Sequence, residues 1–351
     1  MLRPGNISSG WADLLESNRS TMEGDGSGVE AVVVPVVFGL IFVVGVVGNS
    51  LVMVVIGRVK VGVGRGRRSC SPTNTFILNL CAADLSFLLL CVPVHATIYS
   101  LPQWVFGAVL CRFGHYFSTV SMLVSIFTLV AMSVDRYVAV VLSGRSPCVR
   151  SRRSALAGLC VIWSLSLLCS VPVAQHQVLT SHHSAPNSTF CWERWSGASR
   201  RAYRVSVLLI GYLLPLLLIS CCYLRVLFHL HKKLNMSRKS ERSKRKTAQT
   251  VFLLVTAFTI CWMPHHIIAM WVEFGTFPLN EATFAFRIVS HCLSYGNSCV
   301  NPVLYALLSE NFRNSCRQVF TCCFLYQPPP KGKVVRLRME NFSTTHSTTN
   351  I

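Results

Sequence analysis

The chain has 351 residues, of which 52% are hydrophobic and only 13% are charged, and its mean hydropathy is +0.48. Soluble globular proteins carry about a quarter charged residues, so this composition argues against a soluble enzyme domain and indicates a protein that crosses the membrane several times. The formal net charge of +20 does not indicate a nucleic-acid partner, because the basic residues lie in short segments between apolar runs.

Seven apolar stretches reach the roughly 20 residues that a bilayer requires. They predict spanning helices at Ala31–Ile56, Thr73–Tyr99, Val109–Leu142, Ser154–Val173, Tyr203–His231, Ala248–Phe274 and Thr283–Leu308. The predicted fold is therefore an all-α membrane protein with a seven-transmembrane helix bundle at residues 31–308. The sequence contains no internal repeat, which disfavours a transporter built from duplicated halves.

Lys and Arg concentrate in the first, third and fifth loops and are absent from the second and sixth. Because short cytoplasmic loops are enriched in Lys and Arg, the N-terminus is predicted to lie outside the cell and the C-terminus inside. Residues 1–30 are then an extracellular tail, expected to contain no cleaved signal peptide. Three Asn-x-Ser/Thr sequons on outer segments predict glycosylation at Asn6, Asn18 and Asn187.

The segment after the seventh span, residues 309–323, has the pattern of an amphipathic helix. Phe312 and Cys316 share one helical face with two further apolar residues, beside Arg313 and Arg317, which predicts a helix 8 lying on the inner leaflet. Cysteines next to such a helix are candidate palmitoylation sites, and free thiols are the alternative. These cysteines are Cys316, Cys322 and Cys323. Residues 324–351 are expected to form a disordered cytoplasmic tail.

Polar residues inside the spans carry most of the functional information. Asp135 and Arg136 stand at the inner end of the third span, where charges either serve function or extend to the headgroups. Asp84 lies in the middle of the second span. Its carboxylate, with amide and hydroxyl oxygens of other spans, suits a small cation such as sodium; a hydrogen-bond cluster between helices is the alternative. Pro264 and Pro302 are expected to kink their helices.

Two cysteines lie on the predicted outer side. Cys111 is at the outer end of the third span and Cys191 is in the loop after the fourth. The exterior is oxidising, so we expect a disulfide between them. It would tie the long outer loop over the mouth of the bundle.

Together these motifs resemble the rhodopsin-like (class A) G protein-coupled receptors, from about Val32 to Cys323. The matching segments are Gly48-Asn49, Asn79–Asp84, Asp135-Arg136-Tyr137, Trp163, Pro215 with Tyr223, Phe258–Pro264 and Asn301–Tyr305. The resemblance implies activation and G-protein coupling through Asp135, Arg136, Tyr137, Tyr223, Trp262, Pro264, Asn301, Pro302 and Tyr305. It implies a sodium site at Asp84, Ser125, Asn297 and Ser298. Some members restrain the Arg with an acid in the sixth span; Lys244 stands there in this chain, so Asp135 is the expected partner of Arg136.

Several segments further resemble the galanin receptors, type 1 above all. They are Phe117–Leu129, Met263–Ile268, Glu273–Leu279 and Leu308–Arg313. This resemblance implies a neuropeptide agonist, coupling to Gi/o proteins and inhibition of adenylate cyclase. The predicted ligand-binding residues are His95, Phe113, Phe117, His265, His266, Glu273, Phe284, Arg287 and His291. Ala269 departs from the type 1 pattern, which has a further histidine there. A receptor for another neuropeptide, of the somatostatin, opioid or kisspeptin-like kind, is the alternative.

Two other classes of protein fit the sequence less well. A channel or transporter would show a continuous polar path, and an enzyme would show an acid, a base and a nucleophile at one membrane face. The adjacent His265 and His266 diverge by about 100° on a helix, so they are not a metal pair at i and i+4 spacing. We therefore expect a multi-pass plasma-membrane protein, not an enzyme, with no cofactor except possible sodium and with a peptide, a G protein and membrane lipids as partners.

Overall fold

The computed structural model describes the membrane-embedded part of the chain and the segments next to it. The described residues are 29–62, 72–100, 103–142, 150–182, 185–195, 197–232, 238–278, 280–308, 312–314 and 316–317. The predictions for Asn6, Asn18, Cys322 and Cys323 lie outside them, and so do those for the side chains of Asn187 and Lys244.

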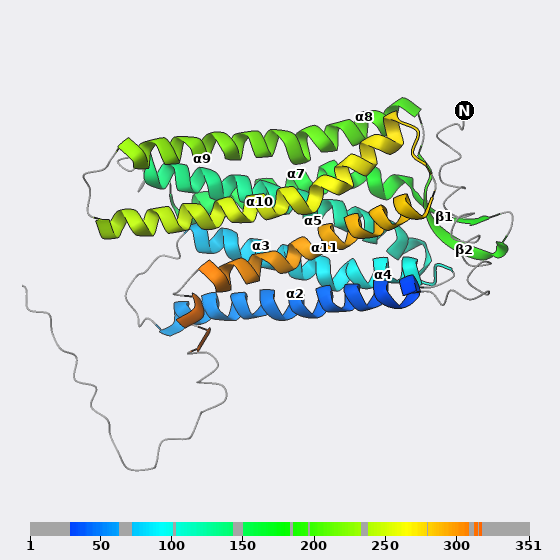
Figure 1. Cartoon of the computed structure of the whole chain (residues 1–351), viewed down its shortest axis with the longest axis horizontal. Helices are drawn as coiled ribbons and strands as arrows, with labels where there is room; N and C mark the ends of the chain where they lie inside the picture. Colours follow the sequence, from blue (N-terminus) through cyan, green and yellow to red (C-terminus); the bar gives the residue numbers. More distant parts are fainter. Residues whose placement is uncertain are drawn as a thin grey trace, which may run out of the picture.

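Every predicted span is helical, and the helices run side by side in one bundle (Figure 1). In chain order they are α2 (Val29–Gly62), α3 (Pro72–Leu90) continued by α4 (Val92–Ser100), α5 (Gly107–Val140), α7 (Arg152–His176), α8 (Gly197–Leu208) continued by η1 (Leu209–Leu213) and α9 (Leu214–Lys232), α10 (Arg238–Phe274) and α11 (Glu281–Leu308). The predicted seven-helix bundle is confirmed.

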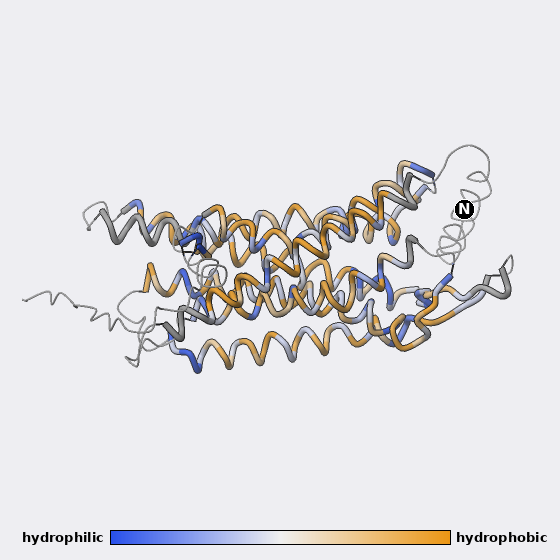
Figure 2. The backbone as a smooth tube through the Cα atoms, turned by 90° about the horizontal axis from the view of Figure 1, so that it is seen from below, coloured by the Kyte–Doolittle hydropathy of each residue, from blue (hydrophilic) through white to orange (hydrophobic). Residues whose placement is uncertain are grey.

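The bundle has the polarity of a membrane protein. Hydrophobic residues predominate along its middle, and hydrophilic residues gather toward both ends (Figure 2). Within the described residues, 6 helices are long and apolar enough to cross a membrane. The remaining spanning helix, α11, has 28 residues but is more polar, because it directs Ser290, Ser294, Asn297 and Asn301 into the bundle, where they are buried. Polar residues on the inner face of a spanning helix avoid the cost of meeting lipid.

The central helix of the bundle is α5, which contacts α3, α4, α7, α9 and α10. Val120, Val124 and Ile126 in its middle are fully buried. Polar bonds join α5, α3 and α7: Asn79 Nδ2 of α3 donates to Thr128 Oγ1 of α5 at 3.0 Å, and Trp163 Nε1 of α7 donates to Asn79 Oδ1 at 2.8 Å. Such bonds hold helices together where lipid supplies no hydrophobic driving force between them.

A π-helical turn, η1, interrupts the fifth span just before Pro215. Proline has no N–H to donate four residues back, and a wider turn lets the chain absorb the missing bond. The turn directs Tyr212 into the bundle, where its Oη donates to the carbonyl oxygen of Thr259 at 2.9 Å. The sequence analysis did not anticipate this turn.

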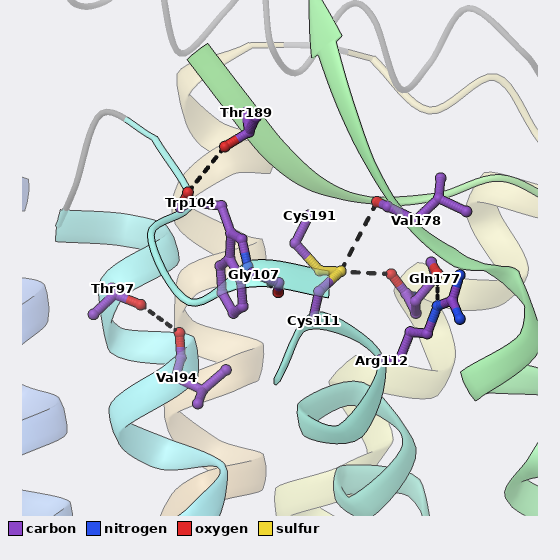
Figure 3. Close-up of a disulfide and its surroundings, with 10 residues drawn as sticks. All are labelled: Val94, Thr97, Trp104, Gly107, Cys111, Arg112, Gln177, Val178, Thr189 and Cys191. Carbon is purple, nitrogen blue, oxygen red and sulfur yellow. Dashed lines mark hydrogen bonds between the residues drawn. A yellow bond between two sulfur atoms is a disulfide. The ribbon is translucent and has the colours of Figure 1, made fainter. Parts of the chain in front are cut away.

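A short antiparallel hairpin covers the outer end of the bundle, an addition to the predicted all-α fold. Its strands are β1 (Gln177–His182) and β2 (Ala185–Glu193). The predicted disulfide is confirmed: Cys111 and Cys191 are bonded, with Cα atoms 5.5 Å apart (Figure 3). Thr189 adds two bonds to Trp104, at 2.7 Å from the Trp104 N–H and 3.0 Å to its carbonyl oxygen. The hairpin is therefore fixed to the outer end of α5.

The short helical segment after α11 lies under the end of the bundle. The rings of Phe312 and Tyr305 are 6.4 Å apart. Arg313 Nη1 donates to the carbonyl oxygens of Ala306 and Leu307 at 3.2 and 2.7 Å, satisfying groups that the end of a helix leaves unpaired. Only residues 312–314 and 316–317 of the predicted helix 8 are described as helical.

The close approach of α2 and α11 gives a test of the fold. A Cβ atom at Gly48 would lie 2.9 Å from Pro302 Cβ, whereas one at Gly39 of the same helix would have no neighbour within 4 Å. We expect Gly48→Val to destabilise the bundle by about 1–3 kcal/mol through overpacking and to lower the melting temperature of the purified protein in detergent. Gly39→Val should leave it unchanged. Equal melting temperatures for the two variants would contradict this packing.

Candidate functional site

A chain of aromatic and imidazole rings crosses the inside of the outer half of the bundle. It starts at His95 of α4, whose ring centroid lies 5.4 Å from that of Tyr295 in α11. The ring of Tyr295 is 5.8 Å from His291, and His291 is 6.2 Å from His265 of α10. The chain continues to His266 at 5.6 Å. Four of the predicted ligand-binding residues are thus brought together, on three helices.

The ring chain ends beside the fifth span. His266 is 5% exposed, its ring lies 4.7 Å from Tyr212 in η1, and its Nε2 has no hydrogen-bond partner. Buried polar atoms are costly to leave unpaired. His266 is therefore a position where a ligand group with hydrogen-bonding capacity would be stabilised.

Two predicted ligand-binding phenylalanines lie outside this chain of rings. Phe284 is buried against Phe277 beneath the outer rim, beside Trp192 of the hairpin. Phe113 is on the outward side of α5, is 37% exposed and lines a crevice with Arg112 and Tyr116. Its ring stacks on Phe117 with centroids 5.5 Å apart, and Phe117 itself packs toward the bundle interior near Tyr295.

Charged residues form a network at the outer rim of the bundle, where the hairpin meets the fifth and sixth spans. Glu273 at the end of α10 is 5% exposed on its side chain and pairs with Arg200 of α8, with Oε1 2.7 Å from Nε. Arg200 Nε also lies 3.7 Å from Glu193 of β2, and Arg204 Nη2 is 2.7 Å from the other oxygen of Glu193. The network links the hairpin, the fifth span and the sixth.

The sequence analysis predicted Glu273 as a ligand-binding residue and did not anticipate this network or its other members. Arg200 and Arg204 are four residues apart and therefore lie on one face of a helix. That spacing was visible in the sequence. The partner residue Glu193 was not predictable, because only the folded hairpin brings it to the helix.

The middle of the bundle holds the predicted sodium ligands. Asp84 is 1% exposed, and Asn301 Nδ2 donates to its Oδ2 at 2.7 Å. Its Oδ1 is buried without a hydrogen-bond partner. Ser125, Asn297 and Ser298 are buried as well. An unpaired carboxylate oxygen and hydroxyl and amide oxygens match a hard cation. Among the residues that the structure describes, no group of three or more His, Cys, Asp or Glu side chains could hold a metal ion.

At the inner end of α5, one carboxylate holds two arginines. Asp135 pairs with Arg136, as predicted. Arg150, just before α7, donates from Nε to Asp135 Oδ1 at 2.6 Å and from Nη2 to Oδ2 at 3.2 Å. Thr73 donates to Oδ2 at 2.9 Å and also contacts Arg136. The contributions of Arg150 and Thr73 were not predicted.

Aromatic residues lie between the outer ring chain and this inner cluster. The ring of Trp262 lies between those of His265 and Phe258, at 5.7 and 5.9 Å, and its Nε1 has no hydrogen-bond partner. Further inward, Tyr223 stacks on Phe252 at 4.6 Å and lines a small cavity with Arg136. The polar oxygen of Tyr305 is buried and unpaired.

Comparison with known proteins agrees with the family that the sequence motifs indicated. The family described as 7 transmembrane receptor (rhodopsin family) matches residues 48–305. Galanin receptor type 1 of Homo sapiens is 60% identical over 299 residues, 85% of this chain and 84% of that protein. The type 1 receptor of Mus musculus is 56% identical over 326 residues, 92% of each. Galanin receptor type 2 of Mus musculus is 43% identical over 339 residues, 95% of this chain and 88% of that protein.

The inner cluster predicts an unequal response to two substitutions. Asp135→Ala leaves two partly buried guanidinium groups facing each other, and breaking such a pair costs about 3–5 kcal/mol. Arg150→Gln leaves the pair of Asp135 with Arg136 intact. We therefore expect Asp135→Ala to lower the melting temperature in detergent by clearly more than Arg150→Gln does. An equal or larger effect of Arg150→Gln would contradict the arrangement described here.

Proposed function

The chain belongs to the rhodopsin family of seven-transmembrane receptors, and we propose that it is a receptor for galanin that acts through Gi/o proteins to inhibit adenylate cyclase. The family consists of receptors, so the expectation that the chain is not an enzyme is confirmed, as is its place as a multi-pass protein of the plasma membrane. A peptide and a G protein are the partners that the family implies.

The ring chain in the outer half of the bundle is the observation that supports a peptide agonist. Imidazole, indole and phenol rings from α4, α10 and α11 lie next to one another, and such groups favour aromatic side chains that also donate hydrogen bonds. His266 Nε2 supplies the unpaired polar atom. Galanin in particular is proposed because relatives at 53–60% identity are galanin type 1 receptors.

Signalling in this proposal is a shift between two populations of the bundle. Agonist bound near Trp262 favours the arrangement in which α10 moves away from α5 at its inner end. Arg136 then leaves Asp135 for the G protein. Reciprocity requires that bound G protein raise agonist affinity by the same factor. Arg150 keeps the Asp135 carboxylate paired when Arg136 departs, which lowers the cost of the exchange.

Cyclic AMP in cells that express this chain tests the proposal. Galanin should lower forskolin-stimulated cyclic AMP, and pertussis toxin should abolish the fall. Arg136→Ala should remove the response while galanin still binds at the cell surface, because the arginine lies far from the ring chain. A response to another neuropeptide, but none to galanin at normal surface expression, would reject galanin and retain the receptor.

The ion pair between Glu273 and Arg200 gives a second prediction. Glu273 is proposed to attract the N-terminal amine of the peptide, yet Arg200 occupies it. Glu273→Gln should weaken binding about tenfold, as expected for loss of one charged hydrogen bond. Arg200→Gln should strengthen it, because the buried carboxylate then lacks a cation. An N-acetylated peptide should respond to neither substitution. Weaker binding of the free amine to Arg200→Gln would show that Arg200 does not compete.

Sodium is proposed as an allosteric ligand of Asp84. The residues present fit the ion, since Asp84 Oδ1 is buried and unpaired. Sodium binding would stabilise the arrangement that has low agonist affinity. Replacing N-methylglucamine by sodium at constant ionic strength should therefore weaken agonist binding to the unaltered receptor, but not to Asp84→Asn. Undiminished sodium sensitivity in the Asp84→Asn variant would exclude this site.

A further inference from the structure

The outer ends of α5 and α7 enclose a crevice that is separate from the ring chain. It is lined by Ala108, Val109, Arg112, Phe113, Tyr116 and Ala174, and its volume is about 290 Å³. Val109 is 78% exposed and Phe113 is 37% exposed. Exposed apolar residues on a spanning helix face lipid, so the crevice opens toward the membrane rather than into the bundle.

The distance of the crevice from the helix ends places it, by inference, at the depth of the lipid headgroups. Arg112 is five residues beyond Gly107, where α5 begins, which corresponds to about 8 Å at 1.5 Å per residue. Ala174 is two residues from the end of α7 at His176. The polar layer of a bilayer extends about 5–8 Å beyond the hydrocarbon on each side. A charged group at this level meets phosphates instead of acyl chains.

The guanidinium group of Arg112 is fixed and still has donors to offer. Its Nε donates to the carbonyl oxygen of Gln177 at 3.1 Å (Figure 3). No carboxylate lies within ion-pair distance of it in the described part of the chain. The two terminal amino groups keep their N–H donors, and a planar guanidinium binds phosphate through two parallel hydrogen bonds. The charge of Arg112 is thus complementary to a phosphate.

The apolar wall below Arg112 is also held in place. The ring of Phe113 stacks on Phe117 with an interplanar angle of 18°. Tyr116 Oη donates to the carbonyl oxygen of Leu167 in α7 at 3.2 Å. These rings follow Arg112 along α5 toward the membrane centre, so a phosphate on Arg112 places an attached hydrocarbon chain against them. A surface with fixed side chains loses little entropy when it binds such a chain.

We propose that this crevice binds one phospholipid of the outer leaflet, with its phosphate on Arg112 and an acyl chain against Phe113 and Tyr116. Arg112 follows Cys111 of the disulfide and holds Gln177 at the start of β1. A lipid bound here therefore contacts the residues that anchor the outer hairpin. The proposal depends on the fold and on the membrane location, and it does not depend on the identity of the agonist.

Photo-crosslinking tests the site directly. The full-length receptor is placed in phosphatidylcholine nanodiscs that contain a trace of phosphatidylcholine with a photoreactive group near the glycerol end of one acyl chain. After irradiation, the labelled peptides are mapped by mass spectrometry. We expect label on residues 107–116 of α5, lowered about tenfold by Arg112→Gln, which removes charged hydrogen bonds to phosphate. Arg201→Gln, an exposed arginine on the same side, should leave the label unchanged.

A second variant keeps the test decisive if Arg112→Gln is poorly folded. Ala174→Trp fills the crevice from the opposite wall without altering Arg112 and should also remove the label, with the melting temperature as the check on folding. Two results would overturn the proposal. One is undiminished labelling of residues 107–116 in folded Arg112→Gln or Ala174→Trp. The other is equal labelling of the unaltered receptor by a photoreactive sterol, which has no phosphate.

Discussion

Polar groups within the bilayer must find partners on other helices, because no water is present to satisfy them. This constraint explains the strongest contacts of the bundle. Asn49 Nδ2 in α2 donates to the carbonyl oxygen of Ser298 in α11 at 2.8 Å. Asn301 of α11 donates to Asp84 of α3, and Asp135 of α5 holds Arg136 and Arg150. The first two contacts fix one helix against another, and the third ties the segment before α7 to α5.

The same constraint makes the bundle able to switch. Contacts of this kind are broken only when another partner takes over, so the helices have discrete arrangements rather than a continuous range. Asp135 has two cationic partners, and the loss of one leaves it paired. Trp262 and Tyr305 each bury a polar atom without a hydrogen-bond partner. In this account the outer ring chain and the inner arginine bias one equilibrium.

The sequence predicted those features that depend on local composition. The spans follow from hydropathy, and each observed helix overlaps the predicted one. A single segment that crosses lipid must pair its own backbone N–H and C=O groups, and it does so only as a helix. The disulfide between Cys111 and Cys191 followed from topology and redox environment. The hairpin β1–β2 was missed, since its strands lie in an outer loop that packs over the bundle only after folding. The π-helical turn at η1 was missed because Pro215 alone does not indicate which residue the chain inserts.

Predictions of the site were less complete for the same reason. His95, His265, His266 and His291 were predicted to bind the ligand, and the structure brings them together. Phe113 shares the aromatic character of that set, but it lies on the outward face of α5. Arg150, Arg200 and Glu193 were absent from the predicted site, because only the folded bundle brings each of them to its partner on another element. Pairing across a bundle depends on tertiary structure, which composition does not specify.

The central claim is that galanin, bound at the outer ring chain, releases Arg136 by moving the inner end of α10. Spin labels at Leu142, which follows α5, and at Gln249 of α10 occupy exposed positions and report the distance between these helices by pulsed electron resonance. Galanin and a G protein together should lengthen this distance, and galanin alone should shift part of the population. A receptor that lowers cyclic AMP in response to galanin with no change in this distance would contradict the account.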